Sequence, residues 1–254
     1  MQEPTVSVKD FSLTLGSKEI VHKLSFDIHP GEVFAFLGAN GSGKTSTIRS
    51  LIGLYEATSG TLHINGRQYT AKDAKNIGYL PEERGLYTRV SAIDNLTYFG
   101  EMKGMSRAEA RKAGMDFLKE VGLEDKATLK LKKLSGGQQQ KVQLGVAVMA
   151  NPNLLILDEP TKGLDPVNRK LLLDIVEHHK QEGAAVIYIT HLMEEVERLA
   201  DRLLIIKDGK AEAYGTVKEV KKQFNANSIE DVFVGIYNET PVKKPKKTAK
   251  KENA

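Results

Sequence analysis

Apolar and polar residues alternate along the first thirty positions of the chain. The alternating apolar positions form short runs: Val6 and Val8; Phe11, Leu13 and Leu15; Leu24, Phe26 and Ile28. A spacing of two places these side chains on one face of a strand, and the pattern is broken at Gly16 and at Pro30–Gly31. We therefore predict an antiparallel sheet at the start of the chain. A further strand is predicted over 61–66, ending in an Asn-Gly turn.

Other short runs are apolar throughout. The first covers residues 33–37, and later runs cover 77–80, 154–157, 185–190 and 203–206. An uninterrupted apolar run of this length is typical of a strand that is buried on both faces. Helical stretches lie between the later runs. This alternation of strand and helix predicts a parallel sheet flanked by helices, which is an α/β architecture.

Residues from about 82 to 145 have a helical character instead. Ser91–Asp94 and Ser106–Glu109 each fit a capping box, in which a serine oxygen and an acid satisfy the free N–H groups at a helix start. The segments that follow have helical propensity as far as about Lys103 and Val121. We predict that a helical block is inserted into the sheet-rich chain.

Composition permits a large core and excludes several classes of protein. The chain has 254 residues, 40% of them hydrophobic, and no cysteine, which excludes disulfides and thiolate metal sites. No apolar run approaches the roughly 18 residues of a membrane span, and the N-terminus has no feature of a secretory signal. Residues 241–254 hold six lysines and one acid, so they contribute +5 to a net charge of +4 and leave −1 elsewhere. A nearly neutral body with a basic tail argues against a nucleic-acid-binding domain.

The most specific motif lies between the strand at 33–37 and a helix predicted over 46–52. Gly38–Thr45 has the sequence Gly-Ala-Asn-Gly-Ser-Gly-Lys-Thr. The glycines let the backbone curl so that its N–H groups face phosphate oxygens, while Lys44 reaches the β- and γ-phosphates and Thr45 offers a hydroxyl to Mg²⁺. A chance match in a Gly-rich turn has a probability on the order of 1%. We predict a nucleotide-binding protein.

Two further segments suit the same chemistry. The run at 154–157 is followed by Asp158 and Glu159. A carboxylate at a strand end can hold Mg²⁺, and its neighbour can orient or deprotonate the attacking water. The alternative for this pair is an ordinary strand that leaves the core through a polar turn. A second Gly-rich helix start over 134–141 can cradle another phosphate.

Together these segments resemble the ATP-binding subunits of ABC transporters over residues 5–235. The matching motifs, in the family's order and spacing, are Walker A (Gly38–Thr45), the signature (Leu134–Gln138), Walker B (Leu154–Glu159), the D-loop (Gly163–Asp165) and the switch histidine (His191). The resemblance implies a P-loop NTPase (RecA-like) core with an N-terminal antiparallel β subdomain. It also implies an inserted ABC-type α-helical subdomain over roughly 82–145. Residues 236–254 are then a basic tail, expected to be disordered.

The resemblance also implies a role for each matching residue. Lys44 grips the phosphates, Glu159 is the general base and His191 senses the γ-phosphate. The implied ligands of Mg²⁺ are Thr45, Glu82 and Asp158. The implied contacts with the chain's own nucleotide are Gly38, Ala39, Asn40, Gly41, Ser42, Gly43, Lys44, Thr45, Ser46 and Leu15. The implied contacts with the nucleotide held by an opposite subunit are Ser135, Gly136, Gly137, Gln138 and Asp165.

Three positions depart from the family's usual residues. Leu15 stands where an aromatic ring normally stacks on adenine, so apolar contact alone is expected there. Glu82 replaces the usual glutamine and still offers an oxygen to Mg²⁺. Lys162 stands where the D-loop often has serine. The string around Glu82, over residues 79–87, resembles that of ATPases serving ABC-2-type exporters of drugs or sodium.

The function implied by the resemblance is that of an ATP-hydrolysing motor subunit in an ABC transporter, with a lean towards export. ATP and Mg²⁺ are the expected cofactors, and ATP-dependent closure of a homodimer or heterodimer would drive a separate polytopic membrane permease. The expected location is the cytoplasmic face of the cell membrane, with no nucleic-acid partner. The alternative is a soluble ABC ATPase acting on the ribosome or DNA, although fused cassettes and long coiled-coil insertions are missing. A nucleotide-dependent regulator is a weaker alternative.

The permease is expected to dock near residues 86–105. This stretch is more apolar than a polar-capped helix requires, and its apolar members are Leu86, Tyr87, Val90, Ile93, Leu96, Tyr98, Phe99 and Met102. Part of the set must pack inward, and the remainder can form a groove for a short helix. The alternative is that all of these residues are core. For the lysines of the tail, a solvated segment is expected, with contact to anionic lipid as the alternative.

Overall fold

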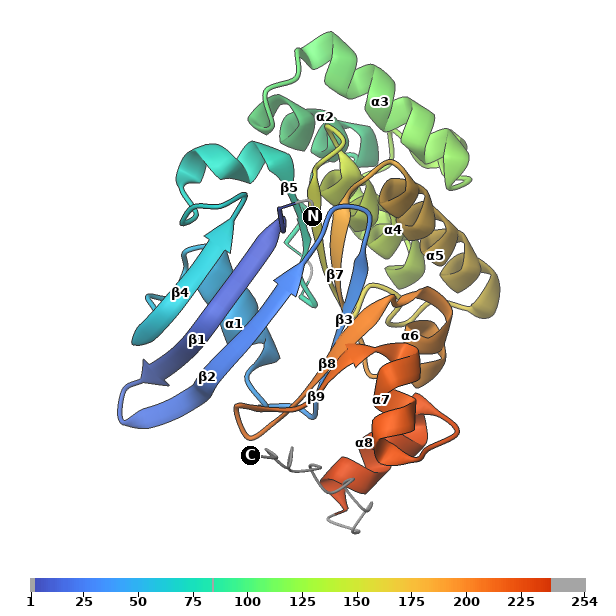
Figure 1. Ribbon diagram of the computed structural model, residues 1–254. Helices are drawn as coiled ribbons and strands as arrows, with labels where there is room; N and C mark the ends of the chain where they lie inside the picture. The colour runs from blue at the N-terminus through green and yellow to red at the C-terminus, as the bar shows by residue number, and fades with distance from the viewer. Residues whose placement is uncertain (1–2, 84, 239–254) are drawn as a thin grey trace, which may run out of the picture.

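The computed structural model describes residues 3–83 and 85–238 (Figure 1). The strands are β1 (Val6–Leu15), β2 (Lys18–Ile28), β3 (Val33–Leu37), β4 (Ser59–Ile64), β5 (Ile77–Leu80), β6 (Leu154–Asp158), β7 (Ala185–Ile189), β8 (Arg202–Lys207) and β9 (Lys210–Thr216). The α-helices are α1 (Lys44–Leu51), α2 (Ala92–Met102), α3 (Arg107–Glu120), α4 (Gly136–Val148), α5 (Pro166–Gln181), α6 (Met193–Leu199), α7 (Val217–Phe224) and α8 (Ile229–Tyr237). Short 3₁₀ helices cover Ala71–Asn76, Glu124–Lys126 and Leu131–Lys133. Within the described ranges, no helix has both the length and the hydropathy needed to cross a membrane.

The predicted N-terminal antiparallel sheet is confirmed. It has three strands in the order β2–β1–β4, and both pairings are antiparallel. Asn65 and Gly66 follow β4 with φ angles of 51° and 77°, as the Asn-Gly turn requires. The regular alternation in β1 is interrupted by a bulge near Asp10, whose φ is 47°. Leu15 is the last residue of β1 and is exposed.

The central sheet has six strands in the order β5–β6–β7–β3–β8–β9. All neighbouring pairs are parallel except β8–β9, which is antiparallel. Strands β3, β6 and β7 are buried along their whole length, as their continuous apolar runs predict. The carboxyl ends of β3 and β6 therefore lie on the same edge of the sheet, with β7 between them, and each is followed by a predicted motif.

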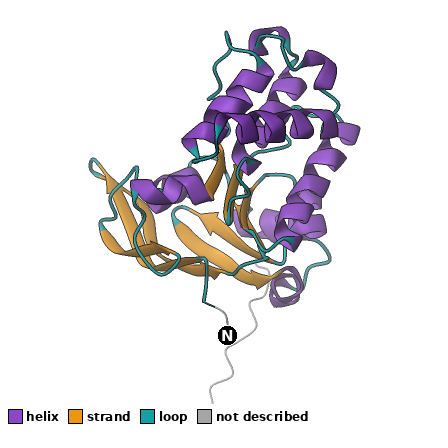
Figure 2. Cartoon of the chain, turned by 90° about the horizontal axis from the view of Figure 1, so that it is seen from above, coloured by secondary structure: helices purple, strands orange, loops and turns teal. Residues whose placement is uncertain are grey.

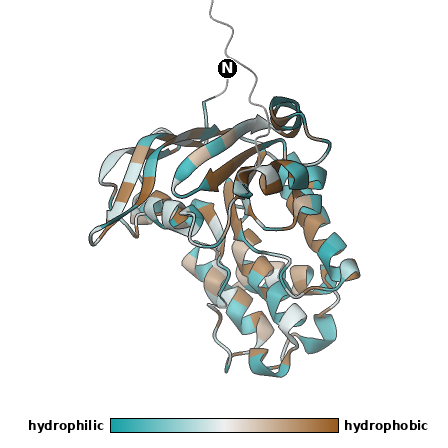
Figure 3. Cartoon of the chain, turned by 90° about the horizontal axis from the view of Figure 1, so that it is seen from below, coloured by the Kyte–Doolittle hydropathy of each residue, from teal (hydrophilic) through white to brown (hydrophobic). Residues whose placement is uncertain are grey.

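Two apolar layers cover the central sheet. One face packs against the antiparallel sheet and α1, through alternate side chains such as Phe34, Phe36 and Ile156. The opposite face carries the intervening side chains and packs against α2, α3, α4 and α5. Seen from above, most of the helices lie on one side of the strands (Figure 2). The central strands are mainly hydrophobic in colour, and the outer helices show mixed hydropathy (Figure 3).

The predicted helical block is formed by α2, α3 and α4. The Ser106–Glu109 capping box is complete, whereas the Ser91 hydroxyl accepts a bond from the N–H of Asp94 and donates one to the Asp94 carboxylate. The helices approach closely at Gly145 of α4, where a Cβ atom would lie 2.5 Å from the Phe117 ring. Glycine at this position lets α3 and α4 pack in direct contact. The block extends to Val148, slightly beyond the predicted limit.

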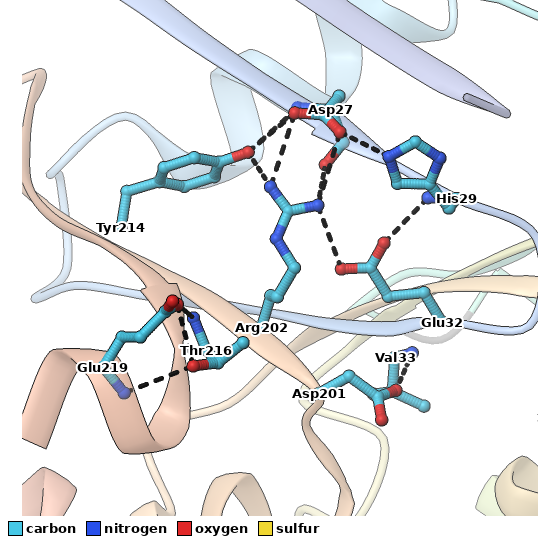
Figure 4. Close-up of polar contacts among 9 residues, drawn as sticks. All are labelled: Asp27, His29, Glu32, Val33, Asp201, Arg202, Tyr214, Thr216 and Glu219. Atoms are coloured by element: carbon cyan, nitrogen blue, oxygen red, sulfur yellow. Dashed lines mark hydrogen bonds and ion pairs between the residues drawn. The ribbon is translucent and has the colours of Figure 1, made fainter. Parts of the chain in front are cut away.

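The C-terminal part adds elements that the apolar runs did not predict. Figure 1 shows α7 and α8 beside β8 and β9, away from α2 and α3. Their apolar faces form a third cluster with β3 and β8. A polar network joins this region to the antiparallel sheet, because Arg202 of β8 pairs with Asp27 of β2, and the Tyr214 hydroxyl of β9 donates to Asp27 over 2.8 Å (Figure 4). Helix α8 ends at Tyr237, two residues past the predicted boundary of the domain, and the basic stretch over 241–254 lies outside the described residues.

Candidate nucleotide-binding site

The phosphate loop connects β3 directly to α1. Gly41 and Gly43 have φ angles of 79° and 108°, which glycine adopts at little cost. Gly38 is required for a different reason, since a Cβ there would lie 2.6 Å from the carbonyl oxygen of Ile206. The first residue of the loop, Gly38, therefore packs closely against the end of β8, and the later residues Gly41 and Gly43 form a sharp turn. The free N–H groups of the first turn of α1 face the space that a phosphate needs.

A cavity of about 500 Å³ lies beside this loop. It is lined by Lys18, Ile20, Asn40, Gly41, Ser42, Gly43, Lys44, Thr45, Ser46, Glu82, Asp158, Glu159, Lys162 and His191. The fold thus gathers the Walker A, Walker B and switch residues, together with Glu82, around one space. Gly38 and Ala39 belong to the same loop but lie outside the lining. Leu15, which is 38% exposed, also lies outside it.

Lys44 is folded back over the phosphate loop. Its Nζ donates to the carbonyl oxygens of Gly38, at 2.7 Å, and Ala39, at 3.1 Å. Burial lowers the pKa of Lys44, while the nearby charges of Asp158 and Glu159 act in the opposite direction. The ammonium group holds the loop in place and faces the same cavity as the carboxylates.

Asp158 is the most buried acid of the site, with only 4% of its surface exposed. Its Oδ2 lies 3.5 Å from the hydroxyl of Thr45. Burial raises its pKa to about 6, and the charges of Glu82 and Glu159 add to that effect, whereas Lys44 opposes it. A buried carboxylate next to other carboxylates needs a compensating cation.

The oxygen atoms at this place fit Mg²⁺. Thr45 and Asp158 supply a hydroxyl and a carboxylate, and Glu82 adds a carboxylate at the cavity wall. Within the described residues, no three acidic or histidine side chains converge closely enough to form a metal site by themselves. Mg²⁺ is commonly bound by one or two carboxylates together with substrate phosphates and water, so this sparse donor set is the expected one.

Glu159 has a strained backbone and a defined partner. Its φ is 50°, and its N–H donates to the Ile189 carbonyl of β7 over 2.8 Å. Its Oε2 lies 2.8 Å from Nδ1 of His191. The Glu159 side chain is 14% exposed and that of His191 is 66% exposed, so the pair joins a largely buried carboxylate to an exposed imidazole. A left-handed conformation is uncommon for a non-glycine residue, and the bond to Ile189 holds this one in place.

Two of the unusual residues pair with each other. Nζ of Lys162 lies 2.7 Å from Oε1 of Glu82, and both residues line the cavity. The bond to Glu82 raises the pKa of Lys162. Helix α4 holds the two loops that carry Glu82 and Lys162. The side-chain amide of Gln143 donates to the Pro81 carbonyl at 3.0 Å, and that of Gln140 donates to the Pro160 carbonyl at 2.9 Å.

The signature residues lie apart from the cavity of their own chain. Ser135 caps α4 and forms a complete capping box with Gln138. Asp165 caps α5 by accepting bonds from the N–H groups of Val167 and Asn168. Ser135, Gly136 and Asp165 are exposed, and none of the five residues predicted to contact the opposite nucleotide lines the cavity.

A buried acid behind the site was not predicted from the sequence. Glu195 of α6 has a side chain that is 2% exposed, and it accepts hydrogen bonds from Thr161 at 2.7 Å and Tyr188 at 2.8 Å. The loop after β6 is thereby tied to β7 and to the helix that follows His191. Burial and Glu195 raise the pKa of Tyr188 well above its usual value, which keeps the donor protonated. The sequence around Glu195, over Met193–Arg198, is typical of an exposed helix and did not indicate that Glu195 is buried.

The comparisons with known proteins agree with this geometry. The family model described as ABC transporter matches residues 21–162. An uncharacterized ABC transporter ATP-binding protein of Methanocaldococcus jannaschii is 43% identical over 218 residues, which cover 86% of this chain and 80% of that one. The linearmycin resistance ATP-binding protein LnrL of Bacillus subtilis is 39% identical over 227 residues, covering 88% and 73%. The Nod factor export ATP-binding protein I of Paraburkholderia xenovorans is 36% identical over 218 residues, covering 85% and 72%.

A solved structure described as the ATP binding subunit of an ABC transporter matches with a TM-score of 0.86. It is 30% identical in sequence, and the match covers 92% of this chain and 99% of that one. The match confirms the predicted α/β fold, a P-loop NTPase core with a parallel-rich sheet and an antiparallel sheet. The chain belongs to the family of ABC transporter ATP-binding subunits.

Proposed function

We propose that this chain binds and hydrolyses MgATP as the motor subunit of an ABC exporter. The observation that carries the proposal is the convergence of Lys44, Thr45, Asp158, Glu159 and His191 around one cavity of about 500 Å³. A bound Mg²⁺ would neutralise charge on the phosphates and complete the oxygen set of Thr45, Asp158 and Glu82.

In this proposal Glu159 is the general base. Water attacks the γ-phosphorus, the bond from phosphorus to the leaving ADP oxygen breaks, and the Glu159 carboxylate accepts the proton of the water. His191 holds the carboxylate at 2.8 Å and is exposed enough to contact the γ-phosphate. The bond from the Glu159 N–H to Ile189 fixes the backbone from which the carboxylate extends. Lys44 keeps the phosphate loop closed around its ligand.

A second subunit completes the site in this proposal. Ser135, Gly136, Gly137, Gln138 and Asp165 lie outside the chain's own cavity, while their helix starts remain accessible. The first turn of α4 offers backbone N–H groups that suit a phosphate. Two chains facing each other would each present these residues to the nucleotide of the other chain, and ATP would act as the contact between them.

The membrane permease is proposed to dock at α2. Tyr87 and Tyr98 are 52% and 42% exposed, and they border a hollow of about 380 Å³. By contrast, Ile93 and Leu96 are buried, so only part of the predicted apolar set is core. The Asn95 side chain exchanges two hydrogen bonds with the backbone of Tyr87, which presents this ring at the surface. The location at the cytoplasmic face of the membrane follows from such a partner.

The lean towards export rests on relatives. The similar proteins of Bacillus subtilis and Paraburkholderia xenovorans are named for linearmycin resistance and Nod factor export. We extend the direction of transport, but not the transported compound, to this chain. The transport path would lie in the permease.

Single substitutions test the catalytic assignment. Glu159→Gln should lower the rate of ATP hydrolysis by about 10²–10⁴-fold, while ATP still binds, because only the proton acceptor is lost. Lys44→Ala should weaken binding itself. Glu83→Gln is the matched control. Glu83 follows Glu82 in the sequence but lies outside the cavity lining, so this substitution should leave the rate of hydrolysis unchanged. Hydrolysis by the Glu159→Gln protein at the wild-type rate would exclude Glu159 as the base.

A further inference from the structure

The C-terminal helix reaches the phosphate loop. The hydroxyl of Tyr237, the last residue of α8, accepts a hydrogen bond of 2.7 Å from the N–H of Ala39. The same hydroxyl donates a hydrogen bond of 2.7 Å to the carbonyl oxygen of Ile206 in β8. One side chain therefore joins the start of the phosphate loop to the central sheet. Tyr237 and Ala39 are 198 residues apart in the sequence.

This contact lies at a point where the loop is already constrained. Gly38 precedes Ala39, and a Cβ at Gly38 would lie 2.6 Å from the same Ile206 carbonyl. The carbonyls of Gly38 and Ala39 also accept the bonds of the Lys44 ammonium. Tyr237 thus binds the N–H of Ala39, while the carbonyl oxygens of Gly38 and Ala39 bind the ammonium of Lys44.

Helix α8 is held firmly enough to act as a support. Its buried residues, Ile229 and Val232, pack in the third apolar cluster. The N–H of Ile229 donates to Glu197 of α6 at 2.8 Å. At the other end, Lys207 donates to the carbonyl of Ile236 at 3.0 Å. These contacts anchor both ends of the helix.

The ring of Tyr237 is itself held in a defined orientation. Phe233 stacks on it with a centroid distance of 4.5 Å and an interplanar angle of 29°. The ammonium of Lys207 lies 5.7 Å from the ring centroid. Stacking and a cation over the ring restrict the side chain, so the hydroxyl is presented to Ala39 at little further cost in conformational entropy.

We propose that Tyr237 is a positioning residue for nucleotide binding, which preorganises the phosphate loop from the C-terminal helix. This inference rests on the proposed ATP-binding function. Tyr237 lies outside the lining of the nucleotide cavity and acts through the backbone of Ala39. Its loss should leave the loop free to sample conformations in which Lys44 and the loop N–H groups no longer converge, which lowers affinity without altering the chemical step.

Removal of the hydroxyl alone tests the inference. Tyr237→Phe keeps the ring and its stacking on Phe233 but removes the hydroxyl that bonds the Ala39 N–H and the Ile206 carbonyl. We expect the Kd for MgATP, and the KM in steady-state hydrolysis, to rise roughly three- to tenfold, as the loss of a partly exposed hydrogen-bond pair implies. The kcat should change less than twofold.

Tyr214→Phe is the matched control. This substitution also removes a tyrosine hydroxyl that is hydrogen-bonded to another element, in this case to the Asp27 side chain of β2 (Figure 4). Tyr214 lies in the same C-terminal part of the chain as Tyr237. It does not contact the phosphate loop. A similar loss of thermal stability in both variants, with weaker ATP binding only in Tyr237→Phe, is the expected result. Equal ATP affinity in the two variants would overturn the inference.

Hydrogen exchange provides a measurement that needs no nucleotide. In the nucleotide-free protein, the amide of Ala39 should exchange about three- to tenfold faster in Tyr237→Phe than in the wild type, because its acceptor is lost. An unchanged exchange rate at Ala39 would overturn the positioning role even if folding were impaired. If the wild-type protein itself did not bind MgATP, the proposed function would fail, which is a different result from equal binding by wild type and variant.

Discussion

Asp158→Asn should stabilise the nucleotide-free protein while impairing its function. The carboxylate of Asp158 lies at the end of β6, 4% exposed, beside Glu82 and Glu159. Asparagine has nearly the same shape and carries no charge. It therefore removes the cost of a buried charge and also replaces a carboxylate proposed to bind Mg²⁺ by a neutral amide, which is a weaker ligand.

The magnitude follows from the pKa of Asp158. Burial, followed by the charges of the neighbouring carboxylates, raises this pKa from 3.8 to about 6. One pKa unit corresponds to about 1.4 kcal/mol, so the charged form is opposed in the folded state by at most about 3 kcal/mol. The Lys44 ammonium is already included as an opposing contribution. Because the hydrogen bond from Thr45 is long and entering water relaxes the site, we expect a gain of about 1–2 kcal/mol in the free energy of unfolding.

The sign of the pH dependence is fixed by the raised pKa. Below about pH 3, Asp158 is protonated in both the folded and the unfolded state, so its burial has no charge penalty. As the pH rises towards about 6, the unfolded carboxyl ionises while the folded one does not, and this opposes folding. Above about pH 6 the penalty is complete. The advantage of Asp158→Asn should therefore be near zero at about pH 3 and constant above about pH 7.

Urea unfolding in EDTA, without nucleotide, measures the difference across this pH range. Asp73→Asn is the control of opposite sign, because hydrogen bonds from Arg67 lower the pKa of Asp73, so its carboxylate stabilises the fold at neutral pH. That contribution is lost as the pH falls through its lowered pKa. A destabilised Asp158→Asn protein at pH 7, or an advantage that does not vary with pH, would refute the reasoning.

Three further predictions concern neighbouring features. Glu82→Ala should raise the Mg²⁺ concentration needed for half-maximal ATP hydrolysis, whereas Glu82→Gln should retain much of the activity; an unchanged Mg²⁺ titration in the alanine variant would leave Glu82 as a surface partner of Lys162. Tyr87→Ala should reduce transport in reconstituted vesicles while basal ATPase activity and stability remain close to wild type, and normal transport would place the docking site elsewhere. Gly145→Ala should lower the free energy of unfolding by about 1–3 kcal/mol, since the added Cβ would lie 2.5 Å from the Phe117 ring; equal urea midpoints would contradict the tight packing of α3 on α4.

The sequence predicted the parts of the fold that are encoded locally. Buried strands such as β3 and β6 have continuous apolar runs, and the phosphate loop has a strict order of residue types. The elements after β8 were missed because β9 has few apolar residues and α7 and α8 are short. Their capping boxes, Thr216–Glu219 and Ser228–Asp231, are signals that could have indicated both helices.

The site was predictable where a motif carries its own chemistry. Lys44, Asp158 and Glu159 are examples, because residue type and strand context predicted that they would lie together, and all three line the cavity. The sequence did not predict that Lys18 and Ile20 line the cavity, or that Glu82 pairs with Lys162. These features depend on which distant segments the fold brings together. The same holds for Tyr237, whose contact with Ala39 leaves no local pattern in the sequence.

ATP-dependent association of Glu159→Gln tests the central claim, that two chains complete each other's nucleotide sites. The mass of the protein in solution should correspond to a monomer without nucleotide and shift to a dimer with MgATP, because slowed hydrolysis traps the closed state. Gly136→Asp, combined with Glu159→Gln, should abolish the shift, since a carboxylate at the start of α4 would repel the γ-phosphate of the opposite subunit. A dimer that forms equally well without ATP, or that survives Gly136→Asp, would contradict the account.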